Sequence, residues 1–446
     1  MPTARSNPNW GDPPWQIDFA PPPATVPASV DVAIIGAGFT GLAAAAWLRH
    51  LAPEKSVAVF EAWRIGAGAS GRTGGMALAE SAAGDIRGLG DPLAGLKHIL
   101  GELGVECELA LPGVWEIARE KGIPHSPIDW NDSGRLRVVN EVPGGTLDPG
   151  KLVAGLARAA SERGAEIFEN HPVTNIEWPD AAAKDRSNDQ CAKGIAQEQA
   201  AKRTAASQAA DQAADGRDEN SRAVIELGGS LRASSRAAHC TASKILFATN
   251  ALSLDLAALE GRAEPKLTLA IATEPLTKTQ LEAIGLAAGN PFYTVDLPYL
   301  WGRVRQDRSV IFGAGLVDAP SSDVPRDVAR DESRGAMKNV SKNDLSRVDI
   351  AAAKPQELFA SIERRIRNLH PALPHVGFTH RWGGPILFQQ NWRPVFAPHP
   401  RSKNAIVLGA YAGHGVALSS YLGAWAAEAL LGRREHPSWG AMPDKA

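Results

Sequence analysis

Three glycines, Gly36, Gly38 and Gly41, stand between an apolar run and an alanine-rich run in "DVAIIGAGFTGLAAAAWL". Because glycine weakens the interior of a strand or helix, this spacing must serve contacts that need bare backbone. In the order G-x-G-x-x-G, the first glycine permits a tight turn, the second admits a pyrophosphate, and the third lets a helix pack on a strand. The start of that helix offers free N–H groups and a positive dipole end to phosphates.

An acidic residue completes this pattern. Glu61 ends the next apolar run, twenty residues after Gly41, where a carboxylate can accept hydrogen bonds from a ribose diol. The glycine pattern alone is a weak signal. With a strand, a helix and an acid in the expected places, it predicts that the chain binds a dinucleotide rather than merely making a glycine-rich turn.

A second glycine-rich turn, "GAYAGHGVALSS", precedes the last apolar segment of the chain. A single fingerprint with a distant strand–turn–helix closing onto it is more typical of FAD than of NAD. A helix starting near Gly415 would aim its positive end at the flavin ring edge that gains negative charge on reduction, a stabilisation of up to about 2 kcal/mol. Gly413, His414 and Gly415 are the candidates, and the alternative for His414 is a turn histidine with backbone contacts only.

The elements that must position these turns follow from hydrophobic periodicity. Residues 30–35 and 56–60 are expected to be strands around a helix over 42–51, which is a βαβ unit. Further helices are expected over roughly 91–121, 151–163, 355–369 and 416–431. Further strands are expected at 134–140, 167–169, 173–178, 243–252, 266–276, 310–316 and 404–410. Trp10 and Trp15 could pin an irregular N-terminal arm to the body.

Composition narrows the class of protein. The 446 residues are 44% hydrophobic and 22% charged, with a net charge of −2, which favours a soluble protein and argues against nucleic-acid or anionic-membrane partners. Three cysteines, Cys107, Cys191 and Cys240, lack metal-type spacing, so neither a metal site nor a disulfide framework is expected. No signal-peptide core and no run of eighteen apolar residues is visible, and the expected location is cytoplasmic.

The segments "DVAIIGAGFTGLAAA" and "VFEAWRIGAGASGRTGG" together resemble the D-amino-acid-oxidase-like superfamily of FAD-dependent oxidoreductases. The R-x-G-x-GASGR-x-GG pattern is similar to that of the gamma-glutamylputrescine oxidoreductase branch, in which "IATEPL", "WGG" and "YAGHGV" recur in the same order. The resemblance covers most of the chain outside two polar insertions, 180–222 and 317–354. It implies an α/β fold, with a Rossmann-like FAD-binding domain and a substrate domain built on a mainly antiparallel sheet.

The resemblance also implies which residues contact FAD, and the lack of a suitably placed cysteine or histidine favours a non-covalent cofactor. The expected contacts are Gly36, Gly38, Phe39, Thr40 and Gly41 at the pyrophosphate, Glu61 at the ribose, Ala69, Ser70, Gly71, Arg72, Gly74, Gly75 and Met76 beside the flavin, Val173 at adenine, Thr249 and Asn250 in a following turn, and Gly413, His414, Gly415 and Val416 at the ring edge.

The substrate side carries fewer signals. The resemblance places Arg303 in the active cavity, where a guanidinium could clamp a carboxylate, and Trp382 near the flavin; a surface ion pair and a core aromatic are the respective alternatives. Tyr299 and Trp301 could wall the cavity or pack in the core. Asn391 and Trp392 replace an acidic pattern that is usual in the family. Lys266 could activate oxygen, although a surface lysine is the default.

These residues predict an FAD-dependent amine or amino-acid oxidoreductase with Arg303, Trp382 and His414 in the catalytic site, and the branch resemblance implies a gamma-glutamylputrescine-like substrate. A hydride would pass from the carbon beside nitrogen to flavin N5, and water would convert the imine to an aldehyde or keto acid. Oxygen as acceptor would give hydrogen peroxide. The alternatives are a dehydrogenase of the same fold using a quinone or protein acceptor, and a flavin-binding protein without turnover.

The expected domain organisation is discontinuous. After an irregular arm over 1–29, the FAD-binding domain takes residues 30–90, 146–250 and 385–446, the last with the C-terminal helix. The substrate domain takes residues 91–145 and 251–384.

Overall fold

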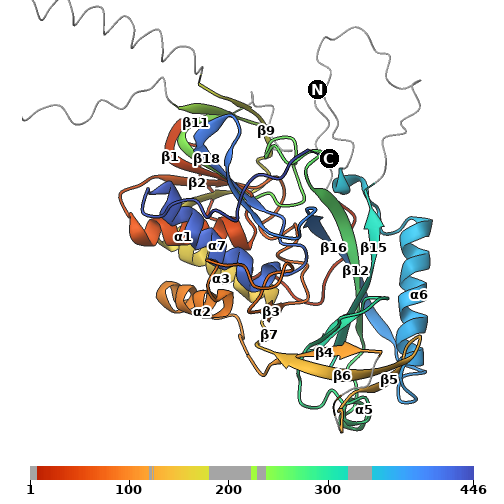
Figure 1. Ribbon diagram of the computed structural model, residues 1–446. Coiled ribbons are helices and arrows are strands. Elements are labelled where there is room, and N and C mark those ends of the chain that lie inside the picture. Colours follow the sequence, from red (N-terminus) through yellow and green to blue (C-terminus); the bar gives the residue numbers. More distant parts are fainter. Residues whose placement is uncertain are drawn as a thin grey trace, which may run out of the picture.

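Two sheets of eight strands each form the framework of the molecule (Figure 1). The computed structural model describes residues 8–119, 123, 125–179, 222–228, 238–319 and 344–445. Most of the two polar stretches 180–222 and 317–354 therefore lies outside the described residues. Within the described chain, no helix is long and apolar enough to cross a membrane.

The first sheet has a parallel centre in the order β18-β11-β1-β2-β8. Its strands read as apolar runs, because both faces of a parallel sheet are covered. An antiparallel strand, β17, extends one edge, while β10 pairs with β11 and β9. The strands are β1 (Ser29–Ile35), β2 (Val57–Phe60), β8 (Glu166–Phe168), β9 (Val173–Glu177), β10 (Ala223–Leu227), β11 (Ala238–Phe247), β17 (Val395–His399) and β18 (Ser402–Gly409).

Helices α1 (Phe39–Leu51), α2 (Pro92–Leu103), α3 (Pro149–Glu162) and α7 (Gly415–Leu430) lie together beside this sheet (Figure 1). Small residues let α1 and α7 approach closely: a Cβ at Gly423 would lie 2.5 Å from the carbonyl oxygen of Thr40. The first-strand turn and the C-terminal turn thus meet at adjacent helix N-termini. Although α2 falls within the range 91–145 assigned to the substrate domain, it packs against α7 and α1.

The second sheet has the order β16-β12-β15-β14-β13-β4-β6-β5, and only the β13–β4 pair is parallel. Its strands are β4 (Val114–Ala118), β5 (Asp129–Asn131), β6 (Arg135–Val142), β12 (Glu264–Thr273), β13 (Phe292–Thr294), β14 (Trp301–Val304), β15 (Val310–Asp318) and β16 (Phe378–Phe388). Helix α6 (Ala353–Leu369) covers it, with the shorter α5 (Lys278–Ala283) and η3 (Leu345–Arg347) nearby. Strands β3 (Met76–Leu78) and β7 (Gly144–Thr146) form a separate pair.

The helix predicted over 91–121 is wrong beyond Leu103, where α2 ends. Asp91 caps α2 by accepting hydrogen bonds from the N–H groups of Leu93 and Ala94. Gly104 then ends the helix in the left-handed conformation, with φ +68°. The leucine spacing that suggested a longer helix runs past this stop, and β4 begins at Val114.

His399, on β17 of the first sheet, is buried. Its ring stacks on Trp178 and Phe247, with centroids 4.7 Å and 5.1 Å apart. Burial lowers its pKa from 6.5 to about 4. In the unfolded chain this histidine binds a proton below about pH 6.5, whereas in the native state it does so only near pH 4. The contribution of the neutral His399 to stability is therefore complete above pH 6.5 and is lost as the pH falls towards 4. We expect His399→Phe to remove on the order of 1 kcal/mol of this loss between pH 7.5 and 5. The free energy of unfolding, measured with urea at pH 7.5 and pH 5, gives this difference. If the original protein and His399→Phe lose the same stability between the two pH values, the pKa shift of His399 does not affect stability.

Candidate flavin and substrate site

The first crossover is built around close backbone approaches at its glycines. Gly36 has φ +104°, and a Cβ there would lie 2.7 Å from the carbonyl oxygen of Ala248. A Cβ at Gly41 would lie 2.0 Å from the carbonyl oxygen of Gly36, so only glycine lets α1 start directly over the turn. Gly38 caps α1 without a side-chain hydrogen bond. The N–H of Phe39 donates to the Ser70 hydroxyl at 2.8 Å, and the remaining N–H groups and the dipole of this N-terminus suit an anionic group.

Glu61 lies at the end of β2, buried, and its carboxylate joins two loops. One oxygen accepts a hydrogen bond from the N–H of Ala37 at 2.9 Å and the other from the N–H of Trp63 at 3.0 Å. Burial raises the pKa of Glu61 above its usual value, and the two N–H groups oppose that rise. Each carboxylate oxygen keeps a further lone pair, so the side chain can still accept a ribose hydroxyl.

The glycine-rich segment over residues 64–76 is held by Arg72, Trp15 and Trp382. The Arg72 guanidinium donates to the carbonyls of Ala67 at 3.0 Å, Trp10 at 3.3 Å and Gly11. Burial lowers the pKa of Arg72. Its own carbonyl accepts a hydrogen bond from the Trp382 indole at 2.9 Å. Arg72 is therefore occupied by main-chain oxygens.

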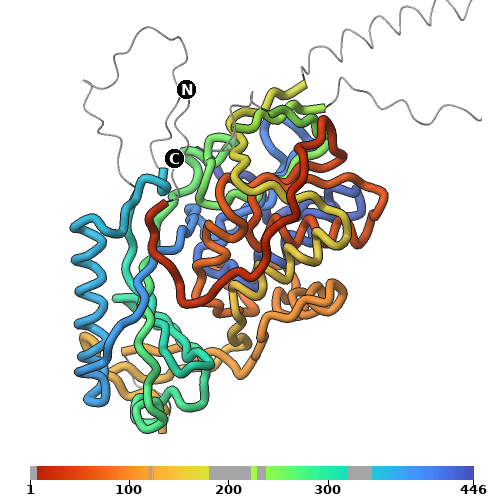
Figure 2. The backbone as a smooth tube through the Cα atoms, turned by 180° about the vertical axis from the view of Figure 1, so that it is seen from behind, coloured from red at the N-terminus to blue at the C-terminus, as the bar shows by residue number. Residues whose placement is uncertain are grey.

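The N-terminal arm closes over this segment from the back of the molecule, where Figure 2 shows the red tube crossing between the two halves. Trp10 is fully buried and Trp15 is 8% exposed, so the expected pinning of the arm is confirmed. The Trp15 indole donates to the carbonyl of Gly71 at 2.7 Å and packs edge-on against Trp382, with ring centroids 5.6 Å apart. The arm thus fixes the peptide that the resemblance places beside the flavin.

Replacing Trp15 with phenylalanine keeps most of the ring and removes one hydrogen-bond donor to Gly71. A hydrogen bond of this kind contributes about 0.5–1.5 kcal/mol, so we expect FAD to bind roughly 3- to 10-fold more weakly to Trp15→Phe. Flavin fluorescence titration of the apoprotein measures the change. The control is Trp439→Phe, because the Trp439 indole N–H has no partner among the described residues. Equal affinities for the two variants would show that the Trp15 contact is not used.

The C-terminal turn adopts a chain of left-handed residues, with φ +59° at Ala410, +49° at Ala412 and +91° at Gly413. Asn250 supports it by accepting a hydrogen bond from the N–H of Ala410 at 2.9 Å. The hydroxyls of Tyr411 and Thr40 lie 2.8 Å apart, which joins this turn to α1. Helix α7 then begins without a side-chain cap, and burial lowers the pKa of His414, whose Nδ1 has no partner among the described atoms.

These turns line one cavity of about 1000 Å³ between the two sheets. Most of the predicted cofactor residues line it: Gly36, Gly38, Phe39, Thr40, Glu61, Ala69, Ser70, Arg72, Gly74, Met76, Val173, Thr249, Asn250, Gly413, His414, Gly415 and Val416. Gly41, Gly71 and Gly75 lie behind the wall, where they permit close backbone packing. A Cβ would lie 2.4 Å from the carbonyl of Gly66 at Gly71, and 2.3 Å from that of Leu147 at Gly75.

The wall is chemically suited to FAD. Two helix N-termini, those of α1 and α7, face the same cavity, and neither N-cap residue makes a side-chain hydrogen bond to its helix. Four buried polar atoms of lining residues have no partner in the described structure: Trp63 Nε1, Thr249 Oγ1, His414 Nδ1 and Ser419 Oγ. Buried polar groups normally find partners, so these atoms fit a ligand rich in hydrogen-bonding groups. No cluster of candidate metal ligands occurs among the described residues.

The second sheet supplies the opposite, largely apolar wall. Trp382, fully buried, lines the cavity with Tyr299 and Trp301, and a Cβ at Gly74 would lie 2.1 Å from the Trp301 ring. Arg303 does not line it. The arginine is 7% exposed, beside Gly75, and its Nε has no partner among the described atoms. Lys266 lies away from the cavity and pairs with Glu264 at 3.0 Å and Asp318 at 3.2 Å, as expected of a surface lysine.

Asn391 and Trp392, which replace the acidic pattern usual in the family, have different roles in the structure. Asn391 accepts a hydrogen bond from the N–H of Arg393 and shapes the turn. Trp392, at φ +62°, lines the cavity and packs edge-on against Phe388. Sequence reasoning missed Trp63, Tyr293, Leu297, Leu316 and Tyr411 as lining residues. Of these, Trp63 and Tyr411 lay within quoted motifs, whereas Tyr293, Leu297 and Leu316 reach the cavity through the pairing of the second sheet.

Comparison with known proteins identifies the family. The family model of the FAD-dependent oxidoreductases abbreviated DAO matches residues 31–429, so the chain belongs to that family. A probable oxidoreductase OrdL of Rhizobium meliloti is 23% identical, over 90% of this chain and 83% of that protein. The structure of glycine oxidase from Geobacillus kaustophilus has a TM-score of 0.58 at 18% identity, over 93% of this chain and 97% of that one.

L-amino acid deaminase from Proteus myxofaciens, solved with anthranilate, has a TM-score of 0.62 at 12% identity, over 96% of this chain and 95% of that one. At these identities the solved structures establish the fold. They confirm the expected α/β architecture with a mainly antiparallel second sheet, and FAD dependence follows from the family. The gamma-glutamylputrescine branch stays a prediction.

Proposed function

We propose that this protein binds FAD non-covalently and oxidises the C–N bond of a small amine or amino acid. The supporting observation is that the N-termini of α1 and α7 face the aromatic wall of the second sheet across the same cavity. The lining contains no cysteine among the described residues. The bound flavin would supply the hydride acceptor.

In this proposal the chain's own residues bind, orient and exclude water. The N-terminus of α1 and Ser70 hold the pyrophosphate, Glu61 holds the ribose, and the N-terminus of α7 stabilises negative charge at the far ring edge. Burial lowers the pKa of His414 and so favours its neutral form, and its Nδ1 has no partner among the described atoms. Trp382 and Trp301 form an apolar wall that would exclude water and hold the substrate carbon in position.

Between these two substrate classes, one observation favours amino acids. Arg303 is a buried guanidinium with an unpartnered Nε and no ion pair in the described chain. Burial lowers its pKa to about 10, so it remains charged at neutral pH. A substrate carboxylate would pair with it, provided that the Gly74–Gly75 turn or Trp301 moves to admit contact. Without such a movement, the cavity favours amines that carry no carboxylate beside the nitrogen.

The test is anaerobic mixing of the FAD-loaded protein with matched pairs: polyamines and their gamma-glutamyl forms, and simple amines beside the corresponding D- and L-amino acids. We expect loss of the visible flavin band with at least one amine. Repeating the reaction in air separates an oxidase, which releases hydrogen peroxide, from a dehydrogenase that uses a quinone or carrier protein. An intact flavin band across the whole panel would overturn the proposal and support a flavin-binding protein without turnover.

A further inference from the structure

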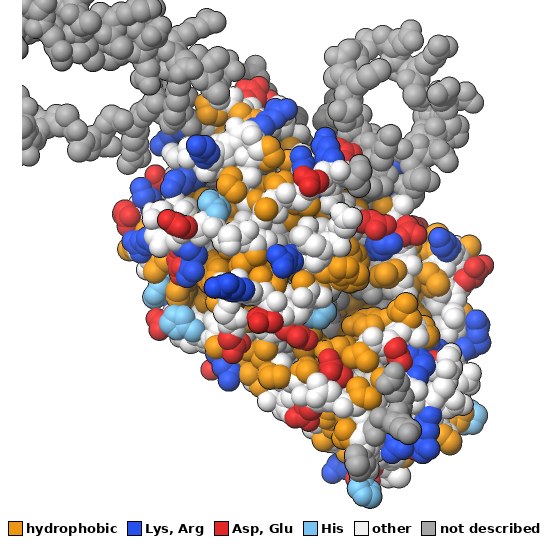
Figure 3. All heavy atoms as spheres, viewed as in Figure 1, with side chains coloured by type: hydrophobic (Ala, Val, Ile, Leu, Met, Phe, Trp, Pro, Cys, Tyr) orange, Lys and Arg blue, Asp and Glu red, His pale blue; other side chains and the backbone are white. Residues whose placement is uncertain are grey.

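The mouth of the cavity carries an unusual share of the exposed apolar side chains. Six large hydrophobic residues are exposed among the described residues, and four of them line this cavity. We call these four, Leu297, Tyr299, Leu316 and Trp392, the apolar rim; their exposed fractions are 83%, 43%, 47% and 50%. Figure 3 shows apolar side chains gathered around a hollow between the two halves of the molecule. Exposed apolar groups concentrated at one opening mark a binding surface.

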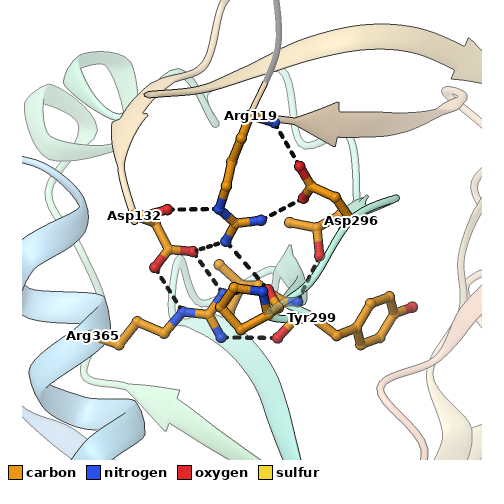
Figure 4. Close-up of polar contacts among 8 residues, drawn as sticks. Arg119, Asp132, Asp296, Tyr299 and Arg365 are labelled. Atoms are coloured by element: carbon orange, nitrogen blue, oxygen red, sulfur yellow. Dashed lines mark hydrogen bonds and ion pairs between the residues drawn. The ribbon is translucent and has the colours of Figure 1, made fainter. Parts of the chain in front are cut away.

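Two of the rim residues sit on the loop 295–300, between β13 and β14, and this loop is held by a buried ion cluster (Figure 4). Asp132, 7% exposed, accepts from Arg119 at 2.6 Å and from Arg365 at 3.0 and 2.6 Å. These three residues come from the chain after β4, the chain after β5, and α6. Asp132 therefore fixes both guanidinium groups in place.

The two arginines in turn hold the loop. Arg365 donates to the carbonyls of Pro298 at 2.7 Å and Tyr299 at 2.9 Å. Arg119 donates to Asp296 through its side chain, and through its backbone N–H at 2.9 Å. Arg119 also donates a hydrogen bond to the Pro298 carbonyl, at 3.3 Å. Every one of these bonds uses the polar inner side of the loop, which leaves Leu297 and Tyr299 free to face the cavity mouth.

We propose that the apolar rim selects substrates that carry an apolar or aromatic tail, and that Asp132 is a positioning residue acting on the rim through Arg119 and Arg365. The inference rests on the proposed function and names the substrate class for that site. Among the described lining residues, the charged side chains are Glu61, Arg72, Asp255 and Asp344, and no lysine is present. The cationic one, Arg72, is occupied by main-chain carbonyls. The described mouth thus offers contact area rather than positive charge to the outer part of a substrate.

The test compares straight-chain amines of increasing length as substrates. Each buried methylene contributes about 0.8 kcal/mol, so kcat/KM should rise up to roughly 4-fold per methylene until the tail passes the rim, and Leu297→Ser should flatten this rise. Asp132→Asn should raise KM for long amines roughly 10-fold, with kcat changed less than about 3-fold and little effect on the shortest amine. Asp129→Asn is the matched control, because Asp129 on neighbouring β5 makes an exposed pair with Arg135.

A second variant and a binding readout keep the inference separate from folding and from turnover. Arg365→Lys keeps a positive charge against Asp132 while losing the fork that reaches both loop carbonyls, and it should reproduce the KM effect. Straight-chain alcohols, which are not oxidised at a C–N bond, should shift the flavin absorption spectrum with affinity that rises with length. If no amine reduces the flavin but the longest alcohols still bind most tightly, the proposed function is wrong, whereas the preference of the apolar rim for apolar tails is supported. Length-independent binding, or equal KM changes for short and long amines in Asp132→Asn, would overturn the inference.

Discussion

Gly41→Ala is expected to abolish FAD binding, weakening it at least 100-fold. The added methyl group would lie 2.0 Å from the carbonyl oxygen of Gly36 and 3.1 Å from Ile34, so backbone rather than a flexible side chain must move. Either α1 shifts away from the turn, or the turn opens. Both movements displace the N–H groups that we assign to the pyrophosphate. Titration of the apoprotein with FAD, followed by flavin fluorescence, measures the loss.

The matched control is Gly101→Ala in α2. A Cβ at Gly101 meets no atom within 4 Å, and alanine is the better helix former by about 1 kcal/mol. This variant should bind FAD normally and melt at the same temperature or slightly higher. Circular dichroism of Gly41→Ala shows whether the apoprotein still folds. A yellow Gly41→Ala protein with unchanged FAD affinity would contradict the role of the third glycine.

The second large effect is expected at Glu61. The Glu61 carboxylate now accepts hydrogen bonds from the N–H groups of Ala37 and Trp63. In Glu61→Gln, the side-chain NH2 group would face one of these two donors and could not accept its hydrogen bond. A buried donor left without its acceptor costs about 1–3 kcal/mol, and the ribose acceptor is weakened as well. We therefore expect the Kd for FAD to rise roughly 10- to 100-fold, measured by the same titration.

Glu169 offers the control for Glu61. It accepts a hydrogen bond from the N–H of Ile65 at 2.8 Å, yet it does not line the cavity. Glu169→Gln should lower stability modestly and leave the Kd for FAD within about 3-fold of the original. Similar losses of FAD affinity in the two variants would mean that Glu61 acts only by holding loops together.

Local chemistry predicted the first crossover well. Strand β1, the glycines, α1, β2 and Glu61 lie next to one another in the chain, and their roles depend on short-range geometry. The same holds for the C-terminal turn and α7. The overextended helix after Asp91 is instructive: the leucine period was correct, but Gly104 in the left-handed region decided where the helix ends.

The substrate wall could not be predicted in the same way. Leu297, Tyr299 and Trp392 reach the cavity because β13, β14 and β16 occupy particular places in one sheet, a long-range arrangement that no local pattern encodes. Arg303 shows the same limit. The strand carrying it could be placed from the resemblance, but whether its guanidinium enters the cavity depends on Trp301 and Gly75, which pack beside it.

The most direct test of the central claim is a titration of the apoprotein with FAD, followed by unfolding of the complex. One FAD should bind each chain, quenched in fluorescence, and all of the flavin should be released when the protein is denatured, because we propose that no covalent bond holds it. Gly41→Ala should show no such binding. Failure of the apoprotein to bind FAD, or flavin that stays attached to the denatured chain, would contradict the account.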